Sequence, residues 1–222
     1  MTKRRPNSAA RSVSRQERGA HTRAAILQAA VAIFSESGYG GARTDAIAGR
    51  AGVNKALLYY YFKSKAGLYA AILEDQLKEF SRRATEALSA EGSSTSKLLR
   101  YVGAHFDFIS QRPYYPRLIQ QLVMTGGKPL ERLLREFFVP LHRKLRSVVE
   151  RGVREGEFRA LDTQHAVLSL AAVIIFYFIS APVWSVVTHT DPYQKTHLAR
   201  RRKEVVKFIR YAFLRDGKDV KA

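Results

Sequence analysis

Residues 22–62 constrain the fold of this chain more than any other stretch, because they hold three short helical segments separated by tight turns. The first segment carries apolar residues at helical spacing between Ile26 and Phe34. This spacing predicts an amphipathic helix over residues 22–37. Gly38 follows directly and is a residue type that commonly ends helices, so we expect the helix to close there.

The second and third segments are separated by the tripeptide Gly-Val-Asn. Thr44 stands where it can cap a helix over residues 45–51, and Gly52 stands where it can end that helix. Asn54 can cap the third helix, over residues 55–62. Short helices joined by a tight turn of this kind indicate a helix-turn-helix motif.

The rest of the chain also has helical periodicity, and no stretch alternates convincingly between polar and apolar residues. The sequence therefore predicts an all-α fold. Ser64 can cap the helix that follows the motif, and the helix that contains Pro140 is expected to kink there. The further helices are expected over residues 65–90, 97–111, 116–125, 129–156, 163–181 and 198–215.

The net charge of +19 is concentrated towards the N-terminus, since residues 1–65 hold twelve basic and three acidic side chains. Such a balance favours a polyanionic partner, either nucleic acid or an anionic membrane face. Residues 1–19 are basic and almost free of apolar side chains, which predicts a disordered arm that is either solvated or follows DNA. We expect three regions: this arm, a helix-turn-helix domain over residues 20–65, and a helical domain over residues 66–222.

The third helix and its flanks carry side chains suited to DNA. Tyrosine can contact a phosphate through its hydroxyl and a base through its ring, while lysine can neutralise a phosphate. Leu58 and Phe62 are expected to face inward, and one or two of the three tyrosines are expected to pack rather than to touch DNA. The residues expected at the DNA are Thr44, Asn54, Lys55, Ala56, Tyr59, Tyr60, Tyr61, Lys63 and Lys65.

The segment from Ala166 to Val187 carries no charged side chain. Its length alone would allow a membrane span. Pro182 and several serines argue against a span, and no second segment is comparable. A helix that is apolar all round can instead be buried by its own domain on one side and by a second subunit on the other. We favour the subunit interface.

Several chemical classes are excluded or disfavoured. The chain has no cysteine, which excludes disulfides, thiolate metal sites and cysteine nucleophiles. Its six histidines have no metal-ligand spacing, and no glycine-rich phosphate loop occurs. We therefore expect no catalytic site, no metal and no cofactor, and the chain is not expected to be an enzyme. The N-terminus lacks the apolar region of a secretory signal, which favours a cytoplasmic protein.

The stretch from Thr44 to Lys65 closely resembles the DNA-binding domain of TetR-type regulators. Three positions depart from the usual pattern: Asn54 replaces Ser or Thr, Ala56 replaces Gly, and Tyr61 replaces His. The first departure preserves the cap, and the other two could alter the preferred operator. The matching residues are Thr44, Ile47, Ala48, Ala51, Gly52, Val53, Leu58, Tyr59, Phe62, Ser64 and Lys65.

The resemblance implies an all-helical homodimer that binds double-stranded operator DNA, usually as a repressor, and that releases it when a small molecule enters the C-terminal domain. It also implies that the last two long helices form the dimer interface. An apolar or aromatic ligand is expected if the central helices enclose a cavity. The alternative is a nonspecific or membrane-anchored polyanion binder. Candidate pocket residues are Phe106, Ile109, Tyr114, Met124, Phe137, Phe138, His142, Phe176 and Tyr177.

Overall fold

The computed structural model describes residues 15–125 and 127–215. Within these ranges the chain forms helices and no β-strand, and the one isolated bridge pairs Phe158 with Leu214. The all-α prediction is therefore confirmed. The chain divides into two compact units, and the division falls after Ile72, inside a single helix, α4 (Lys65–Ser89).

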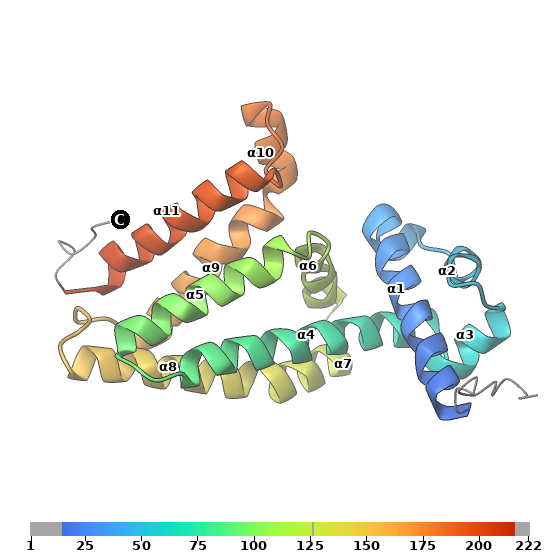
Figure 1. Cartoon of the computed structure of the whole chain (residues 1–222), viewed down its shortest axis with the longest axis horizontal. Helices are drawn as coiled ribbons and strands as arrows, with labels where there is room; N and C mark the ends of the chain where they lie inside the picture. The colour runs from blue at the N-terminus through green and yellow to red at the C-terminus, as the bar shows by residue number, and fades with distance from the viewer. Residues whose placement is uncertain (1–14, 126, 216–222) are drawn as a thin grey trace, which may run out of the picture. The chain divides into compact units, whose positions relative to one another are not determined.

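The first unit contains α1 (Arg15–Gly41), α2 (Thr44–Arg50), α3 (Lys55–Phe62) and the start of α4, all visible in Figure 1. The apolar residues that recur at helical spacing in the sequence are the buried residues of this unit, because each short helix turns one face towards the core. The core side chains of this unit are Ile26, Ala29, Ala30, Phe34, Ala42, Ile47, Ala48, Leu58, Phe62, Leu68, Tyr69 and Ile72.

The first helix begins earlier than predicted, at Arg15 rather than near Thr22. Residues 15–19 of the predicted arm are thus helical, which suits a stretch that contains Arg, Gln and Glu. Residues 1–14 of that arm lie outside the described residues. Gly38 interrupts the helix as expected, with a φ of 66° that glycine adopts readily, and a short helical turn then continues to Gly41.

The second unit is built around α5, which buries most of its residues. Figure 1 shows α5 running through the middle, with α8 on one side and with α9 and α11 on the other. Helices α9 and α11 also pack on each other. The helices after α4 are α5 (Ser94–Ser110), α6 (Tyr115–Thr125), α7 (Gly127–Leu133), the π-helical turn η1 (Leu134–Phe138), α8 (Val139–Arg154), α9 (Thr163–Ile179), α10 (Ala181–Thr188) and α11 (Lys195–Phe213).

The single long helix predicted over residues 129–156 is divided by the π-helical turn η1. Pro140 follows this turn, and it has no amide hydrogen for the carbonyl of Glu136 one turn earlier. A π turn widens the helix at that point and accommodates the proline ring. A kink was predicted at Pro140, and the structure has a local change of helix type directly before this residue.

A buried glycine fixes how the end of α8 packs. Gly152 is buried in α8, and a Cβ atom there would lie 2.3 Å from the ring of Phe158. The ring of Phe158 is itself fully buried and lies 6.1 Å, edge-on, from the ring of Phe213 in α11. The missing side chain at residue 152 thus lets the loop after α8 fold back onto the unit.

The charge-free segment does not form one continuous helix. It breaks at Ser180, and α9 and α10 are bent by 59° relative to each other. Pro182 lies in the first turn of α10, where its missing amide hydrogen costs nothing. Among the described residues, no single helix has both the length and the apolar composition of a membrane span, and only the bent α9–α10 pair passes when taken together.

Candidate nucleic-acid interface and internal cavity

Helix α3 has one buried face and one exposed face. Asn54 caps it as predicted, since its Oδ1 accepts a hydrogen bond of 2.7 Å from the amide of Leu57. Leu58 and Phe62 are buried, which confirms the predicted inward face. Tyr60 is the most exposed of the three tyrosines, with 69% of its surface accessible. The helix therefore offers an aromatic, basic face to solvent.

The predicted DNA-contacting residues divide between this exposed face and the packed interior. Asn54, Lys55, Ala56, Tyr59 and Lys63 are exposed like Tyr60. Tyr61 and Lys65 are only half-exposed, and Thr44 is almost buried.

Thr44 does not cap α2, contrary to the prediction. Arg43 occupies the cap position without a side-chain cap, and Thr44 is the first residue of the helix. The Thr44 hydroxyl instead lies 3.3 Å from the Tyr59 hydroxyl. The reason is tertiary: α3 packs on α2 so that the two hydroxyls meet. Thr44 therefore orients a tyrosine of the exposed face.

Lys55 is already paired with an acidic side chain. Its Nζ lies 2.9 Å from Asp45 in α2, and both side chains are about half-exposed. The hydrogen bond to Asp45 raises the pKa of Lys55, and the same bond lowers the pKa of Asp45. A phosphate contact by Lys55 would have to compete with this ion pair.

The two lysines after α3 differ in their surroundings. Lys63 adopts a left-handed φ of 63°, and its Nζ donates to the carbonyl of Tyr60 at 3.0 Å. Lys65 donates to the carbonyl of Gly40 at 3.3 Å and lies over the ring of Tyr39. Lys65 thus joins α4 to the end of α1, while Lys63 stays beside the exposed tyrosines.

One exposed basic residue at this face escaped the sequence analysis. Arg43 precedes α2, is exposed, and acts electrostatically on both Asp45 and Lys55. The signal was available, because a basic residue next to the start of a helix in this motif is a natural phosphate contact.

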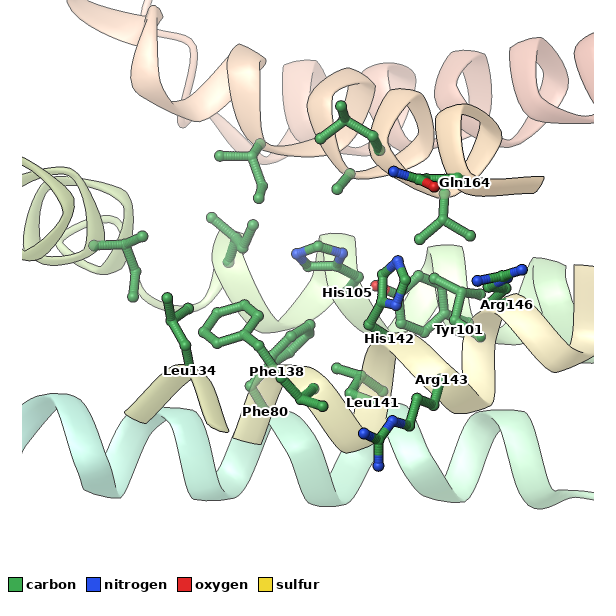
Figure 2. A pocket seen from close by; sticks show the side chains of 18 of the residues that line it. Phe80, Tyr101, His105, Leu134, Phe138, Leu141, His142, Arg143, Arg146 and Gln164 are labelled. Carbon is green, nitrogen blue, oxygen red and sulfur yellow. The ribbon is translucent and has the colours of Figure 1, made fainter. Parts of the chain in front are cut away.

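The second unit encloses a cavity of about 710 Å³, which Figure 2 shows from close by. Helices α4, α5, α6, α8 and α9 contribute its walls, together with η1. The walls are predominantly apolar. Their apolar and aromatic side chains are Phe80, Tyr101, Ile109, Tyr115, Pro116, Ile119, Leu134, Phe138, Val139, Leu141, Leu145, Val167, Leu168, Ala171 and Ile175.

Apart from the hydroxyls of Tyr101 and Tyr115, the polar side chains of the cavity carry nitrogen. No Asp or Glu occurs among the described residues that line it. The polar lining residues other than the tyrosines are His105, His142, Arg143, Arg146, Gln164 and His165. The cavity thus combines apolar walls with hydrogen-bond donors and positive charge.

His105 is a buried side chain of this cavity, with only 3% of its surface exposed. Its ring lies 4.6 Å from the ring of Phe80 and 5.6 Å from that of Tyr101. Its Nδ1 is buried and has no hydrogen-bond partner among the described residues. Burial lowers the pKa of His105 from its ordinary value of 6.5 to about 3, so the imidazole is neutral near pH 7.

Three of the nine predicted pocket residues line this cavity: Ile109, Phe138 and His142. The others lie elsewhere because successive residues of a helix point about 100° apart. Phe106 packs in the core, 5.1 Å from the ring of Phe178, and Met124 is exposed. The hydroxyl of Tyr114 lies 3.5 Å from the side chain of Gln76, and Phe137 is half-buried outside the cavity. Phe176 and Tyr177 line a separate groove together with Trp184.

Sequence reasoning missed His105 and most of the apolar wall. His105 lies four residues before Ile109 on α5, so the helical period could have placed both on one face. Nothing local indicated which face of α5 borders a cavity and which packs in the core.

A surface over α9, α10 and α11 exposes large apolar side chains. Phe176, Trp184 and Phe208 also line two shallow grooves there. Scattered apolar residues are normal on a protein surface, but a concentration of them marks an interaction site. We call this the α9–α11 surface, and its exposed members are Phe176, Val183, Trp184, Val186, Val187, Phe208 and Tyr211.

Two family models match the chain. The model described as bacterial regulatory proteins of the tetR family matches residues 26–72. The model described as the tetracyclin repressor-like C-terminal domain matches residues 95–209, more than half of the chain. The chain belongs to the TetR family. It is therefore a DNA-binding transcriptional regulator and not an enzyme.

Individual members of the family are distant relatives. The HTH-type transcriptional regulator RutR of Escherichia coli strain K12 is 29% identical, over 74% of this chain and 77% of RutR. FadR of Bacillus subtilis, solved with stearoyl-CoA, has a TM-score of 0.67 at 21% identity, over 84% of this chain and 96% of FadR. A regulator from Saccharomonospora viridis, solved with choline, has a TM-score of 0.73 at 18% identity, over 89% of this chain and 100% of that regulator. These structures share the fold of this TetR-family chain.

Proposed function

We propose that this TetR-family protein is a repressor that binds a pseudo-palindromic operator as a homodimer and releases it when a small ligand enters the cavity. The observation that carries the proposal is the two-sided character of α3. Leu58 and Phe62 anchor one face, while Tyr60 and its basic neighbours are exposed on the other. Two such helices, one per subunit, would enter successive major grooves about 34–36 Å apart.

Each exposed residue has its own part in this proposal. Tyr60 reads base edges, and Ala56 allows the helix backbone to approach the groove. Lys63, Lys55 and Arg43 contact phosphates, with Lys55 exchanging Asp45 for a phosphate. The Asn54 cap and the Thr44–Tyr59 hydrogen bond hold the reading face in shape. Tyr61 and Lys65, which are half-exposed, act at its edge.

We propose one role for each of the three regions expected from the sequence. Residues 20–65 would form the DNA-binding domain and residues 66–222 the effector-binding and dimerisation domain. The basic residues 1–19, of which 15–19 begin α1, would add phosphate contacts. Such a regulator meets its operator in the cytoplasm.

Dimerisation is proposed through the α9–α11 surface. A second subunit would bury the exposed apolar side chains that this surface carries, among them Phe176, Trp184 and Phe208. Helices α9 and α11 already pack on each other, so two subunits would form a four-helix interface.

The cavity supports a ligand with an apolar body, because apolar side chains dominate its walls. The FadR structure holds a ligand with a long apolar chain, and the Saccharomonospora viridis structure holds a small cation. Ligands therefore differ widely within this fold. In this protein, a ligand that prefers a dimer with mis-spaced reading helices would shift the population away from the DNA-binding state.

The test is selection of bound duplexes from random DNA by the purified protein near physiological salt, followed by sequencing. The proposal expects two inverted half-sites whose centres lie one helical turn, or a multiple of it, apart. A pool without any preferred sequence would contradict it, and the protein would then be a general polyanion binder.

A further inference from the structure

The charged side chains that line the cavity are all basic. Three histidines, two arginines and one glutamine project from its lining, and no carboxylate occurs among the described residues that line it. A cationic ligand is recognised by carboxylates or by aromatic side chains stacked on its charge. An oxygen-bearing anion is recognised by N–H donors and positive charge. Aromatic rings line the cavity as well, but its formally charged lining residues are two arginines, whose positive charge repels a cation. The lining therefore favours the second kind of ligand.

His105 provides an independent sign that a polar ligand atom belongs inside. Figure 2 shows its ring projecting from α5 into the space between α5 and α9. Buried polar atoms are almost always hydrogen-bonded, yet Nδ1 of His105 has no partner among the described residues. A ligand oxygen that accepts from the Nδ1–H tautomer would supply the missing bond.

Further donors lie on the α8 wall. Figure 2 shows the ring of His142 turned into the same space as His105, with Arg146 beyond it. Arg146 is half-exposed and forms an ion pair with Glu150, to which its Nε donates at 2.7 Å, so a ligand would meet the terminal nitrogens of its guanidinium. The guanidinium of Arg143 is turned away from His105 in the same view, so Arg146 is the arginine that a ligand near His105 would meet.

We propose that the effector is an amphiphilic anion. Its apolar chain fills the wall between Phe80, Leu134 and Phe138, and its oxygen-bearing head lies among His105, His142 and Arg146. This inference rests on the proposed function, because it takes the cavity to be the effector site. It adds the sign of the ligand's charge and the residues that sense it.

The test is isothermal titration of the full-length protein with a series of probes below their micelle concentrations. Octanoate, dodecanoate and hexadecanoate are the anions, while dodecyltrimethylammonium and dodecanol have the same chain as dodecanoate with a positive and a neutral head. One of the anions is expected to bind saturably, at least about tenfold more tightly than the cation and the alcohol, which is the effect of one hydrogen bond to a charged group.

Variants identify where that anion binds. His105→Phe keeps an aromatic ring but loses the buried nitrogen, while His105→Gln restores a donor. Arg146→Met removes one positive charge from the cavity, and Lys203→Met removes one from the exposed side of α11 as its matched control. His105→Phe and Arg146→Met are each expected to weaken binding of the anion about tenfold. His105→Gln should recover part of the affinity, and Lys203→Met should bind like the wild type.

Three results would overturn the inference: the cation binding as tightly as the anions, no anion of the series binding, or wild-type affinity in both cavity variants. None of these measurements involves DNA. An anion that binds as expected but leaves operator binding unchanged would instead contradict the proposed release mechanism, and the ligand chemistry would stand.

Discussion

The hydroxyl oxygens of Thr44 and Tyr59 lie 3.3 Å apart and join the first residue of α2 to the exposed face of α3. This bond connects the two helices of the motif at the point where one of them presents its tyrosines to solvent. The orientation of Tyr59 therefore depends on a residue that is itself almost buried.

A double-mutant cycle measures this connection. Thr44→Val and Tyr59→Phe each remove one hydroxyl while keeping the approximate shape of the side chain. Each single variant and the double variant lose the same hydrogen bond. The loss of unfolding free energy in the double variant should therefore be smaller than the summed losses of the two single variants, by about 0.5–1.5 kcal/mol. Urea unfolding gives the three values. Strict additivity would mean that the two hydroxyls do not interact in solution.

Gly152→Ala is expected to destabilise the protein by about 1–3 kcal/mol, the usual result of overfilling a packed core. The added Cβ would lie 2.3 Å from the fully buried ring of Phe158, so the ring or the backbone would have to shift. Gly49→Ala is the matched control, since a Cβ on that α2 residue meets nothing within 4 Å. Thermal unfolding should show a loss for the first variant and no loss for the second. Equal behaviour of the two would contradict the packing described for α8.

His105 makes the stability of the protein depend on pH. The unfolded chain binds a proton at this residue near pH 6.5, whereas the folded protein does so only at about pH 3. Stability contributed by the neutral imidazole is therefore complete above pH 6.5 and is lost as the pH falls towards 3. Between pH 7 and 5.5 this loss amounts to about 1 kcal/mol. Denaturant unfolding gives the free energy of unfolding at pH 7 and at pH 5.5. The difference between these two values should be about 1 kcal/mol smaller in His105→Phe than in the wild type. An unchanged difference would show that His105 is not buried as a neutral group.

Phe208→Glu is expected to prevent dimerisation. Phe208 is 56% exposed on α11, and a second subunit on the α9–α11 surface would bury the new charge without a partner. Such burial costs about 3–5 kcal/mol, enough to raise the dimer dissociation constant more than about a hundredfold. Sedimentation equilibrium measures this change. Val123→Glu is the control, because Val123 is equally exposed but lies on α6. Monomers in both variants, or dimers in both, would argue for a different interface.

Local signals in the sequence were sufficient for the motif. The bounds of α3 agree with the prediction, because the cap at Asn54 and the inward pair Leu58 and Phe62 are set by neighbouring residues. The fold class followed from the same helical periodicity. Thr44 was assigned wrongly, because its hydroxyl partner lies fifteen residues away on another helix.

The cavity was much harder to predict than the motif. Phe106 and His105 are adjacent on α5, yet the first packs against Phe178 and only the second borders the cavity. The rotation of α5 against α8 and α9 decides whether the side chain of residue 105 or of residue 106 points into the cavity. Many contacts between residues far apart in the sequence set that rotation together. The π turn before Pro140 shifts the register of α8 in the same way.

In the proposed function, α3 reads a DNA sequence through Tyr60. The most direct measurement is the equilibrium affinity of wild type and Tyr60→Ala for the selected operator and for a scrambled duplex of the same length and salt. The variant should lose about 1–3 kcal/mol on the operator and almost nothing on the scrambled duplex. Lys63→Met, which removes a phosphate contact, should weaken both duplexes alike. If Tyr60→Ala keeps the wild-type ratio of the two affinities, the exposed face of α3 does not read the operator through Tyr60.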